Sequence, residues 1–64
     1  RDEVEAAAHV RAAEEARAAA ERAARFAPHG QVQARRERLK EATRVALQAE
    51  LELEKIRRRE AGNG

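Results

Sequence analysis

The sequence predicts an all-α chain: an antiparallel hairpin of two long helices that assembles into a four-helix bundle or a larger helical oligomer. Alanine, the residue with the highest helix propensity, makes up seventeen of the 64 residues. A single proline interrupts the chain, inside the turn-like stretch Ala-Pro-His-Gly at residues 27–30. A connection of about four residues makes two helices antiparallel neighbours. Residues 1–64 therefore form one small helical domain.

The first helix is expected over about residues 2–26. Asp2 is a suitable N-cap, and the carboxylates that follow it favour the positive end of the helix dipole. Nothing breaks the helix before Pro28, which forces the preceding residue out of the α region.

The second helix is expected over about residues 31–61, after a turn in which Gly30 supplies a permissive backbone. The arginines at 57–59 favour the negative end of this helix. The Gly-Asn-Gly sequence at 62–64 is expected to end it.

Each helix is expected to have one face that packs in the hairpin. The expected stripe on the first helix contains Ala12, Ala16, Ala19, Ala20, Ala23, Phe26 and Ala27. The expected stripe on the second helix contains Val32, Leu39, Ala42, Ala46, Ala49, Leu53 and Ile56, with Val45 at its flank. Such a seam brings helices close together but buries little volume, because the alanine side chain is a single methyl.

Leu47 and Leu51 fall outside the stripe of the second helix and lie one turn apart. A two-helix hairpin has a single seam, so these leucines have no partner within the chain. We therefore expect them at an interface between identical subunits, most simply a homodimer. The full set of expected interface residues is Leu47, Leu51, Val45, Ala16, Ala20 and Ala23.

The chain resembles computationally designed helical bundles in two stretches of low complexity. These stretches are Glu14 to Arg22, which reads EEARAAAER, and Leu51 to Arg59, which reads LELEKIRRR. The absence of Ser, Cys, Met, Tyr and Trp is a further similarity. The resemblance implies that assembly is the function, although a natural coiled-coil fragment from a GC-rich genome has similar features.

The composition argues against catalysis, because the chain has no Ser or Cys nucleophile and no glycine-rich phosphate loop. Nucleic-acid binding is not expected either. The basic cluster of Arg35, Arg36, Arg38 and Lys40 lacks aromatic residues and is interrupted by acidic ones. No apolar run is long enough for a membrane span and no signal segment is visible, so a cytoplasmic location is expected by default.

His9 suggests one alternative function, a cofactor carrier that binds haem or a divalent metal. It lies among alanines, and Glu5, one turn earlier, is suitably placed to orient its ring. The simpler interpretation is a histidine that only fixes the register of packing. A third possibility is a small helical binder that presents the second helix to a foreign protein. His29 falls in the turn and is expected to be solvated.

The charges predict how two subunits are oriented. Residues 20–41 around the turn carry a local charge of +3, whereas the two ends of the chain together carry −2. Arg35 and Arg36 lie unfavourably near the positive end of the second helix and are expected to face carboxylates of a neighbour. We therefore expect the turn of one subunit beside the termini of the next.

Overall fold

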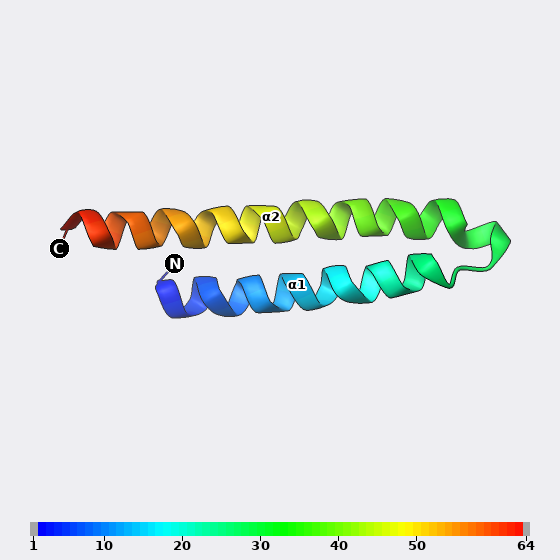
Figure 1. The fold of residues 1–64 in the computed structure, drawn as a ribbon, viewed down its shortest axis with the longest axis horizontal. Helices are drawn as coiled ribbons and strands as arrows, with labels where there is room; N and C mark the ends of the chain where they lie inside the picture. The colour runs from blue at the N-terminus through cyan, green and yellow to red at the C-terminus, as the bar shows by residue number, and fades with distance from the viewer. Residues whose placement is uncertain (1, 64) are drawn as a thin grey trace.

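The computed structural model describes residues 2–63 and confirms the two-helix hairpin. Helix α1 spans Glu3–Arg25, a short 3₁₀ turn η1 spans His29–Gln31, and helix α2 spans Val32–Asn63. The two helices run side by side in opposite directions, with the turn at one end and both termini at the other (Figure 1). No strand occurs within residues 2–63.

The beginning of α1 agrees with the prediction. The Oδ1 atom of Asp2 accepts a hydrogen bond from the backbone N–H of Glu5 at 2.8 Å. This bond satisfies one of the N–H groups that a helix N-terminus leaves without a partner. The other end is also close to its predicted place, because α1 stops at Arg25 and Pro28 adopts an extended backbone with φ −60° and ψ 152°.

Helix α2 is longer than predicted at its C-terminal end. It begins at Val32 and continues through Gly62 to Asn63, whereas the prediction ended it near Ala61. Within residues 2–63 no residue has a positive φ, so Gly62 does not adopt the left-handed conformation of a glycine C-cap. A glycine costs only about 1 kcal/mol in a helix, which a final turn tolerates.

The core of the hairpin is a narrow seam that is mostly alanine. Of the residues whose burial the structure describes, 2–62, six are buried: Ala6, Ala13, Ala46, Ala49, Leu53 and Ile56. They form two clusters, one around Leu53 and Ile56 near the termini and one of three alanines further along. Val10 packs against both clusters and connects them.

The predicted stripe of α2 is confirmed, but most of the stripe predicted for the first helix is wrong. Five of its seven residues are exposed: Ala12, Ala16, Ala19, Ala23 and Phe26. The other two, Ala20 and Ala27, are half-buried and belong to the seam, which also uses Ala6, Val10, Ala13, Arg17 and Ala24. Each of the five exposed residues is next to a seam residue in the sequence, which is a rotation of about 100° around the helix.

Arg35 stabilises the turn end of the hairpin. Its Nη1 atom donates to the backbone carbonyl of Ala23 at 2.9 Å, in the last turn of α1. Its Nε and Nη2 atoms donate to Oε1 of Gln31 at 3.0 and 2.7 Å. The sequence suggested that Arg35 would face carboxylates of a neighbouring subunit. Its guanidinium instead binds groups within its own hairpin. A cation near the last carbonyls of α1 is favourable for the dipole of that helix.

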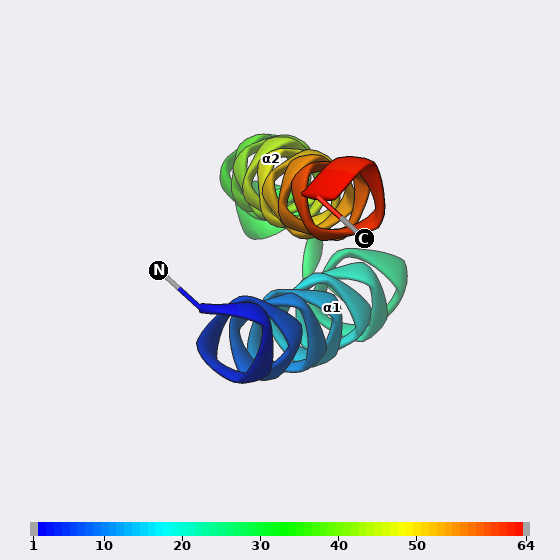
Figure 2. The same ribbon diagram turned by 90° about the vertical axis from the view of Figure 1, so that its left-hand side faces the viewer.

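The hairpin is a rod of 53 × 14 × 14 Å, and its radius of gyration is 15.0 Å. A globular chain of this length has a radius of gyration of about 10.7 Å. Viewed along the rod, the two helices lie one above the other and no third layer covers either of them (Figure 2). Each helix therefore has only one packed side.

Candidate interaction surfaces

The exposed side of α1 carries a second regular stripe, which we call the α1 outer face. It consists of His9, Ala12, Ala16, Ala19, Ala23 and Phe26, at spacings that alternate between three and four residues. This spacing is typical of a helix that packs along its length on another helix. The alanines are exposed, His9 is half-buried, and the Phe26 side chain is 75% exposed. An exposed aromatic ring at the end of such a stripe indicates a contact surface.

Two charged residues border the α1 outer face. Glu15 and Arg22 are both exposed and lie two turns apart on the same edge of the stripe. Neither side chain has an ion pair or hydrogen bond with any other residue between 2 and 63. Both charges are thus available to a partner.

Leu47 and Leu51 are exposed on α2, as the sequence predicted, with exposed fractions of 56% and 60%. They lie roughly 150° from the centre of the seam on the helical wheel. Leu51 borders a shallow hollow together with Glu54, Lys55 and Arg58. Val45, grouped with these leucines in the prediction, is half-buried and packs against the alanine cluster of the seam. It belongs to the hairpin's own packing.

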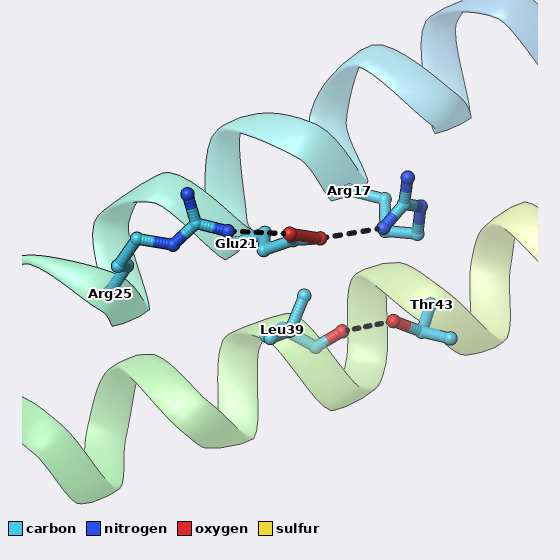
Figure 3. A network of polar contacts seen from close by, with 5 residues as sticks. All are labelled: Arg17, Glu21, Arg25, Leu39 and Thr43. Carbon is cyan, nitrogen blue, oxygen red and sulfur yellow. Dashed lines mark hydrogen bonds and ion pairs between the residues drawn. The ribbon is translucent and has the colours of Figure 1, made fainter.

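Most of the ion pairs within residues 2–63 lie along single helices. Glu21 accepts from Arg17 and from Arg25, each at 3.1 Å, so one carboxylate joins two arginines (Figure 3). Glu54 and Arg58 form a further pair at the same spacing of four residues on α2. Pairs of this kind contribute about 0.3–0.5 kcal/mol each, so they support the helices without fixing the hairpin.

Arg17 occupies a position of the seam itself. It is half-buried, and its guanidinium is turned along α1 toward Glu21 (Figure 3). On α2, the Thr43 hydroxyl donates to the backbone carbonyl of Leu39 at 2.8 Å (Figure 3). The middle of the hairpin therefore has polar side chains whose hydrogen bonds are made within their own helix.

Two carboxyl groups meet across the seam. A hydrogen bond with Glu14 raises the pKa of the Glu50 carboxyl, desolvation adds to the shift, and Arg17 acts in the opposite direction. On the surface of α2, the opposite case occurs: a hydrogen bond from Arg44 lowers the pKa of Glu41. Glu14 and Glu50 thus couple the two helices through a protonation equilibrium. The Glu3 carboxylate of α1 also joins the helices, in an ion pair with Nε of Arg57 on α2 at 3.5 Å.

His9 and Glu5 differ in their surroundings. His9 is half-buried at the edge of the seam, whereas Glu5 is exposed. No group of three or more His, Asp or Glu side chains within residues 2–63 is arranged to hold a metal ion. Haem or metal binding at His9 stays a prediction. His29 is exposed in the turn.

The remaining basic residues near the turn are solvated. Arg36, Arg38 and Lys40 are exposed, and Glu37 and Glu41 lie between or beside them. No helix within residues 2–63 combines the length and apolar character that a membrane crossing needs.

Sequence reasoning missed the α1 outer face as a separate surface, because it assigned those alanines to the hairpin seam. The signal that distinguishes the two stripes is Val10, the only large apolar residue in the middle of α1, which lies in the true seam. Comparison of the chain with protein-family models, curated proteins and solved structures found no match.

Proposed function

We propose that the hairpin is a structural element that assembles with copies of itself and has no catalytic role. The assembly buries the apolar side chains that one hairpin leaves exposed. These side chains are the α1 outer face and the pair Leu47 and Leu51.

The accessible surface of the hairpin is the observation that carries this proposal. It is 5018 Å² for a chain of 7.1 kDa. A globular monomer of this mass exposes about 4,100 Å². The excess of roughly 900 Å² is close to the roughly 800 Å² that each partner buries in a stable protein complex.

The distribution of apolar residues supports the same conclusion. Of the large apolar side chains, only Leu53 and Ile56 are buried, whereas Val4, Phe26, Leu47 and Leu51 are exposed. Burying a leucine or phenylalanine side chain stabilises a protein by about 1.5–3 kcal/mol, which is much more than burying the single methyl of alanine. Burial of these four exposed side chains would therefore have to come from contacts between molecules.

Sedimentation velocity over a range of concentrations, with far-UV circular dichroism on the same samples, tests the proposal. We expect a mass above that of one chain and a helicity that increases with concentration. A chain that sediments as a helical monomer at all concentrations would overturn the proposal.

The double variant Leu47→Glu/Leu51→Glu tests the leucine pair in the same experiment. We expect it to lower the mass of the assembly, because an interface does not tolerate two unpaired carboxylates. The matched control is Gln33→Glu/Ala61→Glu, which adds the same charge at exposed positions and removes no large apolar side chain. An unchanged mass in the leucine variant would show that Leu47 and Leu51 lie outside the interface.

A further inference from the structure

We infer that the α1 outer face is the primary contact, where it pairs with the same face of a second copy in an antiparallel dimer of fixed register. This inference rests on the proposed self-assembly and specifies its geometry. In this register, Ala16 of one copy packs on Ala19 of the second, and Ala12 packs on Ala23. His9 packs on the exposed ring of Phe26.

The hairpin provides the rule for such a pairing. Its own seam brings Ala6 against Leu53 and Ala13 against Ala46, so positions on the two antiparallel stripes pair in reverse order. The α1 outer face has the same alternation of three and four residues. Laid antiparallel on itself, it matches along its whole length, about 25 Å from His9 to Phe26.

The bordering charges select this register from its neighbours. In the full-length register, Glu15 of each copy meets Arg22 of the other, so the two-fold axis produces two opposite-charge pairs. A shift of one heptad in one direction places Arg22 against Arg22. A shift in the other direction places Glu15 against Glu15. Only the register that uses the entire face is electrostatically complementary.

The two charges do not pair with each other inside one chain. Glu15 and Arg22 are seven residues apart on α1, about 10 Å along the axis, and neither side chain has a hydrogen bond or ion pair with another residue between 2 and 63. Any energetic coupling between these two positions must therefore pass between copies. This separation makes the inference testable by charge exchange.

The experiment measures the dissociation constants of Glu15→Arg, Arg22→Glu, the double variant Glu15→Arg/Arg22→Glu, and an equimolar mixture of the two single variants. Each single variant replaces two attractive contacts in its homodimer by two repulsive ones. We expect the dissociation constant of each single variant to rise by roughly tenfold or more. The double variant restores both pairs with reversed signs, and the mixture restores them in a heterodimer. We expect both to associate nearly as tightly as the unsubstituted chain.

The matched control is Glu60→Arg, which makes the same charge change at an exposed residue of α2 near its C-terminal end, past Arg57, which pairs with Glu3 at the beginning of α1. It is expected to leave the dissociation constant within about twofold, as exposed charges away from an interface contribute little. Circular dichroism at high concentration confirms that each variant is helical.

The outcomes separate this inference from the proposal beneath it. An unsubstituted chain that is monomeric overturns both. An unsubstituted chain that associates, but whose single variants are not rescued by the double exchange or by mixing, overturns the α1 pairing and leaves self-assembly in place. Rescue in both forms establishes the antiparallel pairing of Glu15 with Arg22.

Discussion

At the scale of single residues, Arg35 shows how the two helices are joined at the turn. Its guanidinium bonds to the carbonyl of Ala23 on α1 and to the side chain of Gln31 in η1. One half-buried side chain therefore connects the end of α1, the turn and the beginning of α2. The sequence could not show this role, because a position near the positive end of α2 gives no indication of the α1 carbonyl opposite it.

Replacing Arg35 by Ala should destabilise the hairpin by about 1–2 kcal/mol, because it leaves a carbonyl near the end of α1 without this partner. Chemical denaturation followed by circular dichroism measures the effect. Arg36→Ala is the matched control, since the Arg36 side chain is exposed and has no hydrogen bond or ion pair with another residue between 2 and 63. Equal effects of the two substitutions would contradict the role given to Arg35.

The contact of Glu14 with Glu50 should make stability depend on pH. The pKa of Glu50 is raised in the folded hairpin above its ordinary value of 4.5, so the folded state binds this proton more tightly than the unfolded chain. The contribution of the Glu14–Glu50 hydrogen bond to the free energy of unfolding is fully present below pH 4.5. It is lost as the pH rises through the pKa that Glu50 has in the folded hairpin.

Glu50→Gln removes this titration and keeps a side chain that can donate to Glu14. Thermal unfolding from pH 3.5 to pH 7 should therefore show a smaller loss of stability with rising pH in the variant than in the unsubstituted chain. The lowered pKa of Glu41 gives the opposite trend, but it is common to both proteins and cancels in the comparison. Glu37→Gln, at an exposed position, should keep the pH dependence of the unsubstituted chain, and identical profiles for all three proteins would refute the coupling.

At the scale of the helices, the sequence predicted the packing face of α2 correctly and most of the packing face of α1 incorrectly, for a physical reason. The stripe of α2 contains Leu39, Leu53 and Ile56, whose large side chains identify the buried side. In α1 the alanines are distributed so widely that two stripes, one residue apart, have the same spacing. Phe26 favoured the wrong stripe, because an isolated aromatic residue suggests burial although the structure leaves its ring in solvent.

The alanine cluster of the seam is expected to control the distance between the helices. Ala46 and Ala49 are only 3% and 2% exposed, and they pack against Ala13. Ala49→Leu inserts a larger side chain where helices approach closely and should destabilise the hairpin by about 1–3 kcal/mol. Urea denaturation measures the change in the free energy of unfolding. The control is Ala34→Leu, which makes the same substitution at an exposed position. A stabilised Ala49→Leu variant would mean that the seam has space to fill.

At the scale of the whole molecule, the sequence predicted the hairpin from its single turn and from the run of helix-forming residues on either side. It also predicted that Leu47 and Leu51 would be exposed. It could not specify which face of α1 is free, because that depends on the pairing of two helices far apart in the chain. The charges of the two ends predict that the subunits are antiparallel. They do not predict the register of the pairing, which can be proposed only once the free face of α1 is known.

Distances between spin labels test this orientation directly. The chain has no cysteine, so His29→Cys introduces one labelling site in the exposed turn of each copy. The two-fold axis of the proposed dimer passes between residues 16 and 19, which places the two Arg25 residues at the ends of α1 about 22 Å apart at 1.5 Å per residue. The labelled turns lie beyond these ends and are therefore farther apart. Raising the salt to 1 M shortens the Debye length to about 3 Å and should weaken the dimer without changing this distance in the dimers that remain. Labels separated by less than about 20 Å would place the turns together, which no antiparallel pairing of the full α1 outer face allows.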